Sequence, residues 1–411
     1  GVFDTGDGHR VFNVNDMNRS NLRIVEINGL TLTGGDYAFD GGGVHNREQL
    51  TIANSVVTGN AAGQDGGGVY NFYGSLSVDN STISGNSAGA VGGGIVNSLG
   101  TATVTNSTIS SNVADNRGGG IGIPSNGSTT TVIQSTISYN SALGGGGISN
   151  SSDDALTVIS STIRGNTAQT LGGGIDNRGT TTVTHSTLSR NSANAGGGLA
   201  NFGSGTLAVN NSTVSNNSAD SGGGIFGFGP LVTTTIANST ISGNSATEEA
   251  GGVYSGGTTD PMVVTNSIVA NSISGEDLVG NFSGDHNLIE DGSLLASFTN
   301  SKSGDPQLGP LQNNGGPTFT HTLLPGSPAI DLGVPAFATP PDFDQRGNPF
   351  SRVHNGRIDI GSYESQPLLA DANGDHVVDG LDFLLIQIAG GDIAQWDAEY
   401  GVSEPAAPPL M

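Results

Sequence analysis

A short acidic segment near the C-terminus has the residue types and spacing of a calcium loop. Oxygen-bearing side chains occupy loop positions 1, 3, 5, 9 and 12, and the backbone carbonyl of Val377 would serve position 7. The ligands would be Asp371, Asn373, Asp375, Val377, Asp379 and Asp382. Calcium is a hard cation that takes about six to eight oxygen ligands. The sequence therefore predicts calcium as a bound cofactor at this loop.

The last ligand of the loop is Asp382 rather than Glu, which makes the segment similar to one repeat of a dockerin, a calcium module of secreted bacterial proteins. His376 stands at position 6, where glycine usually makes the sharp turn. Residues 390–396 resemble the second dockerin helix without its ligands. Because half of the module is absent, we expect a calcium staple within or between chains rather than docking to a cohesin. The alternative is an acidic helix cap without metal.

Most of the chain before this loop repeats with a period of about 26 residues. The clearest copies read Asn-Ser-Thr-Ile-Ser-x-Asn. The closing Asn recurs at Asn60, Asn86, Asn112, Asn140, Asn166, Asn191, Asn217, Asn244 and Asn271. A fixed period of about 20–50 residues indicates a solenoid, in which each repeat is one structural unit that buries its apolar face against its neighbours.

Each repeat contains short runs in which apolar and small polar residues alternate, as in 76–78, 80–84 and 92–97. Alternation with a period of two indicates strands and not helices. Three strands per repeat predict an all-β fold, a right-handed parallel β-helix of about ten coils and on the order of 50 Å in length. Residues such as Ile83 and Ile95, with their equivalents in other repeats, would form an aliphatic core.

Glycine and asparagine mark the corners of the predicted coils. Glycine triplets such as 92–94 recur in each repeat, and glycine tolerates the positive φ and close backbone approach that a tight corner needs. We expect the recurring Asn side chains to stack and to hydrogen-bond neighbouring backbone. A second, partial row would do the same: Asn46, Asn71, Asn97, Asn150, Asn177 and Asn201.

The texture of the sequence divides the chain into four segments. Residues 1–45 hold a degenerate first coil, and residues 46–299 are the regular β-helix repeats. Residues 300–365 are rich in Pro and turns, and we expect them to cap the open end of the coils, since bare strand edges invite aggregation. Residues 366–411 hold the partial dockerin-like calcium module, with a small helical pattern, and a polar tail.

The Gly-Gly-Gly-Ile and Ile-x-x-Asn pattern resembles the repeats of bacterial polymorphic outer-membrane and surface β-helix proteins. Residues 305–364 resemble the tail of secreted bacterial β-helix repeat proteins. The resemblance implies a secreted bacterial protein located outside the cell or at the cell surface, with a structural or adhesive role.

Composition excludes several functions. Acidic residues outnumber basic residues by 36 to 12, for a formal net charge of −24. Nucleic-acid binding needs a basic surface and is therefore disfavoured. No apolar run reaches the length of a transmembrane helix, so no membrane span is predicted. The chain lacks Cys, which excludes disulfides and a Cys nucleophile.

Catalytic residues are hard to place on the coils. A polysaccharide lyase of this shape needs a Lys or Arg base, yet Lys302 lies outside the regular coils. The coil arginines look scattered: Arg47, Arg117, Arg164, Arg178 and Arg190. A hydrolase needs two carboxylates about 5–10 Å apart. The acidic pairs Asp153/Asp154 and Glu248/Glu249 are adjacent in sequence, so their side chains would point in opposite directions.

Two further groups of residues have a structural interpretation. We expect His185, which replaces a ladder Asn, to be buried and hydrogen-bonded. The tail contains a group that could form a site, although salt bridges and turn caps are the favoured interpretation: His321, Asp331, Asp344, Arg346 and Asp359. The sequence therefore assigns no catalytic residue.

If Ile83 points inward, its neighbours Thr82 and Ser84 point outward. The outward pairs would be Thr82/Ser84, Thr108/Ser110, Thr136/Ser138, Thr187/Ser189, Thr213/Ser215 and Thr240/Ser242, with an interruption at Arg164. We expect a non-catalytic extracellular surface protein with a structural or adhesive role, which self-associates or binds cell-surface glycans. The alternatives are an extracellular polysaccharide lyase or glycoside hydrolase, and an ice- or glycan-binding protein that uses the Thr/Ser sheet.

Overall fold

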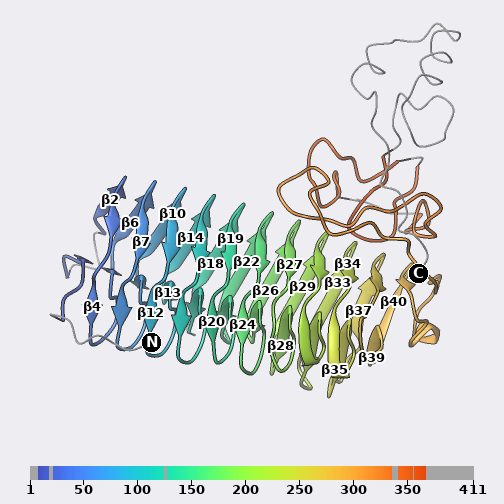
Figure 1. Ribbon diagram of the computed structural model, residues 1–411, viewed down its shortest axis with the longest axis horizontal. Coiled ribbons are helices and arrows are strands. Elements are labelled where there is room, and N and C mark those ends of the chain that lie inside the picture. The colour runs from blue at the N-terminus through green and yellow to red at the C-terminus, as the bar shows by residue number, and fades with distance from the viewer. Residues whose placement is uncertain (1–7, 18–21, 125–126, 336–340, 355, 367–411) are drawn as a thin grey trace, which may run out of the picture.

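The chain forms a parallel β-helix in this computed structural model, which describes residues 8–17, 22–124, 127–335, 341–354 and 356–366 (Figure 1). It passes through sheets A, B, C and D in turn and then returns to sheet A one coil further along. Sheets A, B and C have 11 strands each. The predicted all-β parallel β-helix is confirmed. The predicted helical calcium module, with its ligands at residues 371–382, lies outside the described residues.

Sheet A contains β1 (Phe12–Val14), β5 (Val44–Asn46), β9 (Val69–Phe72), β13 (Ile95–Ser98), β17 (Ile121–Ile123), β21 (Ile148–Asn150), β25 (Ile175–Asn177), β28 (Leu199–Phe202), β32 (Ile225–Phe228), β36 (Val253–Gly256) and β39 (Leu278–Gly280). Sheet B contains β2 (Ile24–Asn28), β6 (Gln49–Ala53), β10 (Ser75–Asp79), β14 (Thr101–Thr105), β18 (Thr129–Ile133), β22 (Ala155–Ile159), β26 (Thr180–Thr184), β29 (Thr206–Asn210), β33 (Thr233–Ala237), β37 (Met262–Thr265) and β40 (Phe282–Asp285).

Sheet C contains β3 (Thr31–Leu32), β7 (Val56–Thr58), β11 (Thr82–Ser84), β15 (Thr108–Ser110), β19 (Thr136–Ser138), β23 (Thr162–Arg164), β27 (Thr187–Ser189), β30 (Thr213–Ser215), β34 (Thr240–Ser242), β38 (Ile268–Ala270) and β41 (Leu288–Ile289). Sheet D contains the short strands β4 (Asp36–Tyr37), β8 (Ala61–Ala62), β12 (Ser87–Ala88), β16 (Val113–Ala114), β20 (Ser141–Ala142) and β24 (Thr167–Ala168). The pair β31 (Ser218–Ser221) and β35 (Ser245–Glu249) follows separately, and η1 (Leu295–Ser297) is a 3-10 helix.

The strand register keeps equivalent apolar residues in line through the core. Ile83 pairs with Val57 on one side and Ile109 on the other, and all three are fully buried. Sheets A, B and C contribute such rows to one continuous apolar cluster that runs from Val14 to Phe298. The two-residue strands of sheet D were not expected, because a Ser-Ala pair is too short to show a period.

Eight asparagines form a continuous ladder at the corner between sheets C and D. Each side-chain nitrogen donates to the Oδ1 of the Asn one coil further on, at 3.0 Å in every step from Asn60 to Asn244. These residues are at most 1% exposed. The expected stack is therefore confirmed, but Asn271 is not part of it. Residues 271–277 cross to sheet A without a regular sheet D strand, so Asn271 is exposed and donates to Ser242 Oγ.

The second row also hydrogen-bonds as expected, in two parts. Asn46, Asn71 and Asn97 form one run, and Asn150, Asn177 and Asn201 form another. Ile123 occupies the position between them, which leaves Asn150 Oδ1 buried without a donor. A row of serines, missed in the sequence, runs along the corner between sheets B and C. There the backbone N–H of Ser81 donates to Ser107 Oγ at 3.0 Å, and the other coils repeat this contact.

The glycine triplets allow adjacent coils to approach closely at the corner before sheet A. Gly92 has φ +66, a conformation that other residues rarely adopt. A Cβ atom on Gly94 would lie 2.6 Å from the carbonyl oxygen of Gly120 on the next coil. The triplets are therefore required by backbone packing, as the sequence predicted.

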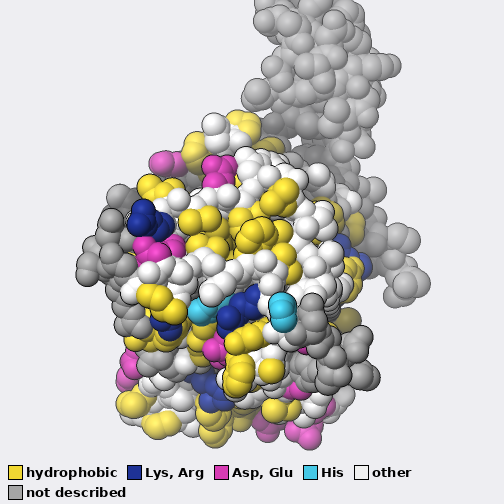
Figure 2. Space-filling model, turned by 90° about the vertical axis from the view of Figure 1, so that its left-hand side faces the viewer, with side chains coloured by type: hydrophobic (Ala, Val, Ile, Leu, Met, Phe, Trp, Pro, Cys, Tyr) yellow, Lys and Arg dark blue, Asp and Glu magenta, His cyan; other side chains and the backbone are white. Residues whose placement is uncertain are grey.

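The two ends of the solenoid differ. At the N-terminal end, apolar side chains lie next to basic ones (Figure 2), and Ile24 and Phe39 are 84% and 56% exposed. At the other end, Phe298, which follows η1, packs on Phe282 with ring centroids 6.4 Å apart and covers the core. This short turn covers the end that residues 300–365 were expected to cap.

The described residues of the segment 306–366, which are 306–335, 341–354 and 356–366, lie instead along the side of the solenoid, over sheet C of the C-terminal coils (Figure 1). We call them the lateral domain. Their few pairings are isolated antiparallel bridges, such as Leu308 with Leu323. Ile360 and Ala329 of this domain share a small apolar cluster with Ile268 of β38. The described part of the chain contains no helix long and apolar enough to cross a membrane.

Candidate functional site

An open cleft of about 400 Å³ lies where the lateral domain meets the outer face of sheet C. Strands β19, β23 and β27 form its floor, and the lateral domain forms one wall. The described residues that line it are Thr136, Thr162, Arg164, Thr187, Ser189, Arg190, Leu311 and Phe319. They include hydroxyls, two guanidinium groups and an aromatic ring that is 48% exposed, and no carboxylate or imidazole.

The floor follows directly from the repeat. In a strand, alternate side chains point to the same face, so the inward Ile163 leaves Thr162 and Arg164 pointing outward. Arg164 pairs in register with Ser138 and Ser189, so it takes the place of a serine in this column. Arg190 follows Ser189 at the corner and has φ +56. The same corner carries Gly85 and Gly165 in other coils, which shows why glycine is favoured there.

Hydrogen bonds to the outward hydroxyls hold the wall in place. Thr187 Oγ1 donates to the carbonyl oxygen of Phe319 at 2.6 Å, and Thr318 Oγ1 donates to that of His185 at 3.1 Å. Gln345 is fully buried and donates from Nε2 to Thr187 Oγ1 at 3.0 Å. The Phe319 ring is therefore positioned by its own backbone and is free to face the cleft.

The predicted Thr/Ser face is present but interrupted by more than Arg164. Pairs Thr82/Ser84 and Thr108/Ser110 are partly exposed on the N-terminal coils. Pairs Thr187/Ser189, Thr213/Ser215 and Thr240/Ser242 are buried beneath the lateral domain. The idea of one flat hydroxyl sheet over all coils is therefore wrong, because a later part of the chain covers three of the six pairs and hydrogen-bonds to Thr187, Thr213, Ser215 and Thr240.

The sequence did not reveal the arginine pair, because the coil arginines looked scattered. The numbering held part of the signal, since a separation of 26 residues places Arg164 and Arg190 on adjacent coils, about 4.8 Å apart along the axis. The register pairs Arg164 with Ser189, so Arg190 lies one residue further along the neighbouring coil. The contribution of Phe319 could not be anticipated, because the lateral domain has no repeat that would place it.

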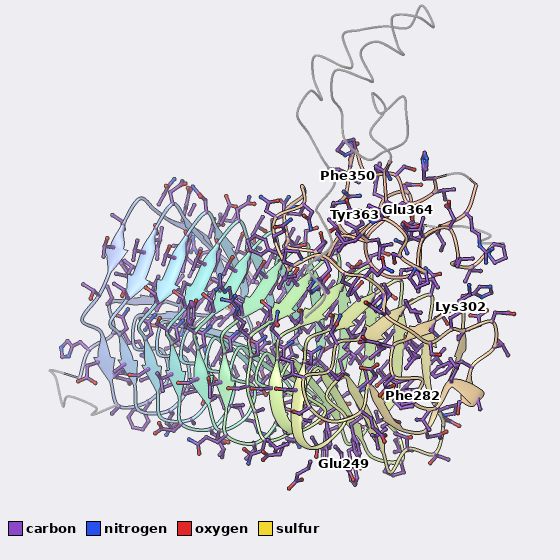
Figure 3. The ribbon with its side chains drawn as sticks, turned by 45° about the vertical axis from the view of Figure 1, so that its right-hand side comes forward. Glu249, Phe282, Lys302, Phe350, Tyr363 and Glu364 are labelled. Carbon is purple, nitrogen blue, oxygen red and sulfur yellow. The ribbon has the colours of Figure 1, made fainter. Side chains whose placement is uncertain are left out.

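The acidic pairs weighed as catalytic groups do not enter the cleft. Asp154 is 2% exposed, and its Oδ1 accepts from the backbone N–H of Ser128 at 2.7 Å, which is a structural role. Glu249 lies at the end of β35, on a part of the solenoid remote from the lateral domain (Figure 3). His185 is half-buried and contacts Thr184 Oγ1 at 2.9 Å, so it has a local partner as expected.

The tail residues form a buried ionic network inside the lateral domain. Arg346 is paired with Asp344 at 2.6 Å and lies between the rings of Phe350 and Tyr363, each 3.8 Å from its guanidinium carbon (Figure 3). His321 contacts Gly309 O at 2.7 Å and Ser215 Oγ at 3.0 Å. The favoured interpretation, structural salt bridges, therefore agrees with the contacts of these side chains.

Glu364 belongs to the same network and predicts a pH dependence of stability. It is fully buried, and burial, together with the charge of Asp359, raises its pKa to about 8 from 4.5, although Arg352 opposes the shift. A raised pKa means that the folded state holds the proton more tightly than the unfolded state. The contribution of Glu364 is fully present below pH 4.5 and is lost as pH rises through about 8.

We therefore expect the melting temperature to fall between pH 6 and pH 8, where the unfolded state has lost this proton and the folded state still holds it, and we expect Glu364→Gln to flatten this fall. Differential scanning calorimetry at several pH values measures both. The matched control is Asp277→Asn: burial raises the pKa of Asp277 to about 6, so most of its own contribution is lost below this window. An unchanged slope in Glu364→Gln would contradict the assignment.

A second, acidic pocket lies at the last coil. Asp277, Glu290 and Asp291 line it. The backbone N–H of Asp277 donates to Asp291 Oδ2 at 2.8 Å, and that of Asp291 donates to Asp277 Oδ2 at 3.1 Å. Ser272 Oγ donates to the remaining oxygen of Asp277 at 2.7 Å. These carboxylates are engaged in closing a turn, and no cluster of metal-ligating side chains occurs among the described residues.

Comparison with known proteins gives little beyond the fold. No protein-family model matches the chain, and no curated protein matches it. Among solved structures, a crystal structure of the pectate lyase Pel9A is similar, with a TM-score of 0.49 and 12% sequence identity. The similar region covers 84% of this chain and 88% of that chain. At this level of similarity, nothing about activity follows from the likeness.

Proposed function

We propose that the protein is a non-catalytic carbohydrate-binding protein that works outside the cell as an adhesive element, and that the cleft on sheet C holds the glycan. The observation that carries this proposal is the lining of the cleft. The partly exposed hydroxyls of Thr136 and Thr162, two guanidinium groups and the exposed ring of Phe319 line about 400 Å³ of open space. Convergent polar groups next to apolar surface are typical of ligand sites.

The same lining argues against hydrolysis. Glycoside hydrolysis uses a pair of carboxylates that flank the scissile bond, and the described residues around the cleft include none. The groups in the cleft are sufficient for binding. Sugar hydroxyls can accept from guanidinium groups and can exchange hydrogen bonds with threonine hydroxyls, and a sugar ring can pack on an aromatic ring.

A polysaccharide lyase is the second candidate, and one observation favours it. A lyase of this shape would use a basic side chain to abstract a proton, and Arg164 and Arg190 lie in the cleft. The product of such a reaction is an unsaturated sugar end, so turnover and simple binding are distinguishable in one assay.

The test is a binding screen of the purified protein against immobilised polysaccharides, with product analysis of the same samples. We expect retention on at least one polysaccharide with no new reducing ends and no unsaturated sugars. Phe319→Ala should weaken this binding by about tenfold, because the ring supplies contact area. The matched control is Phe39→Ala, which removes another exposed ring from the first coil. Turnover would favour the lyase, and equal losses in both variants would remove the cleft from the proposal.

The proposed function also includes calcium binding at the C-terminal loop and self-association of the protein. Calcium at residues 371–382 would staple the C-terminal module, either to its own chain or to a neighbouring one, and the likeness to secreted surface proteins supports an extracellular location. These elements stay predictions.

A further inference from the structure

We infer that the cleft on sheet C selects acidic sugars, with the carboxylates of a uronic-acid chain bound by Arg164 and Arg190; this inference rests on the proposed glycan-binding role and names the ligand class. The chain as a whole argues the other way, because its net charge of −24 repels anions. A pair of positive charges in the proposed sugar site is therefore informative.

Both guanidinium groups are available. Neither Arg164 nor Arg190 forms an ion pair or a side-chain hydrogen bond with another residue in the described ranges, whereas Arg23 pairs with Asp16 at 2.9 Å. The chain has 36 acidic residues, so the absence of a carboxylate next to Arg164 and Arg190 in the described part of the chain does not result from a shortage of acidic side chains. An unpaired guanidinium group in an open cleft can receive a carboxylate from solution.

The corner that carries Arg190 has a positive φ in every regular coil and is occupied by glycine in some coils and by Ser111, Tyr139 or Asn216 in others. Arg190 occupies a corner at φ +56, where glycine stands in several sister coils. A residue other than glycine held in this region stores on the order of 1 kcal/mol of strain. Arg164 replaces a serine in a column that carries Ser138 and Ser189 on the adjacent coils.

The spacing fits a polymer rather than a single anion. The two arginines come from adjacent coils, which are about 4.8 Å apart along the solenoid axis, and Arg190 is offset from Arg164 by one residue along the coil. A guanidinium group binds a carboxylate through two parallel N–H donors in a planar fork. Two forks on successive coils can therefore hold successive carboxylates of a chain that runs across the strands of sheet C.

One aromatic ring lines the cleft, and a second lies near Arg164. Phe319 forms the wall on the lateral domain. The ring of Tyr139 is 59% exposed, and Arg164 lies 5.7 Å from its centroid. Tyr139 lies across Gly165, where a Cβ atom would come within 2.8 Å of Tyr139 Cε1, so this ring is held flat against the corner. The apolar faces of a sugar can pack on such rings while its carboxylate reaches an arginine.

The sister coils supply substitutions that the fold already tolerates. Arg164→Ser restores the serine of that column, and Arg190→Gly restores the corner glycine, so neither variant should impair folding. The control is Arg23→Gln, which removes one positive charge from the first coil, far along the chain from the cleft. The probe is a short oligouronate, titrated by calorimetry in the presence of a chelator so that calcium cannot bridge it to acidic side chains.

We expect each cleft variant to lower the affinity by about tenfold, as for the loss of one charge-assisted pair, and the double variant to abolish measurable binding. Arg23→Gln should bind as the unchanged protein does. Equal affinities in all variants would overturn the inference. Binding of the carboxyl-reduced, neutral oligosaccharide with the same affinity would also overturn it, while leaving the proposed glycan-binding function intact. Failure to bind any glycan would remove both.

Discussion

Replacement of Asn112 by alanine is expected to lower the free energy of unfolding by about 2–4 kcal/mol, because it leaves buried polar groups without partners. Asn112 Oδ1 accepts from both the backbone N–H and Nδ2 of Asn86 at 3.0 Å. Its own Nδ2 donates to Ile83 O at 2.9 Å and to Asn140 Oδ1 at 3.0 Å. Alanine would remove all four contacts in a corner that water does not reach, since Asn112 is fully buried.

Urea unfolding followed by circular dichroism measures this effect as a shift of the midpoint. The control is Asn116→Ala, which truncates an exposed asparagine of the same coil that lies outside the ladders and should change stability by less than about 0.5 kcal/mol. A ladder variant as stable as this control would mean that the stacked amides do not contribute to stability.

The largest effect is expected for Gly93→Ala. A Cβ atom at this position would meet the carbonyl oxygen of Val113 and would lie 2.6 Å from that of Gly119, both on the next coil. These atoms belong to backbone that is hydrogen-bonded along the solenoid, so they cannot rotate away as a flexible side chain would. We expect a loss of more than about 3 kcal/mol in the free energy of unfolding, measured by urea unfolding.

The expected loss comes from the close approach of the coils at Gly93 and not from the removal of a glycine in general. Gly144→Ala is the control for this distinction. Its φ is not in the left-handed region, and the nearest atoms to an added Cβ atom lie 3.5 Å away, at ordinary contact distance. This variant should melt within a few degrees of the unchanged protein. If both variants melt alike, close approach of the coils does not explain the glycine triplets.

The fold could be predicted because its determinants repeat. One inward isoleucine, one corner asparagine and one glycine triplet per repeat specify a coil, and stacking follows from the fixed period. The ladders were also accessible, since an Asn that returns every coil has its own equivalents as neighbours. The exceptions to the ladders could be seen only in the structure. Ile123 interrupts the second Asn row, and Asn271 does not join the ladder that ends at Asn244.

The candidate site was largely beyond the sequence. Half of the cleft comes from the lateral domain, whose Phe319 meets Thr187 across 132 positions of chain. Contacts of this kind follow from tertiary packing and produce no periodic pattern in the sequence. The spacing of Arg164 and Arg190 places them on adjacent coils, but their offset by one residue and the wall that faces them are seen only in the structure.

The lateral domain also has a consequence for resistance to a pulling force. In a solenoid each coil contacts only its neighbours, so a load applied at one end can peel the coils off singly. Residues 306–366 hydrogen-bond to Thr187, Thr213, Thr240 and Asn266, which lie on four successive coils. These coils are thereby tied in parallel, and a tether attached near the C-terminus would have to detach the whole domain before any one of them could unwind.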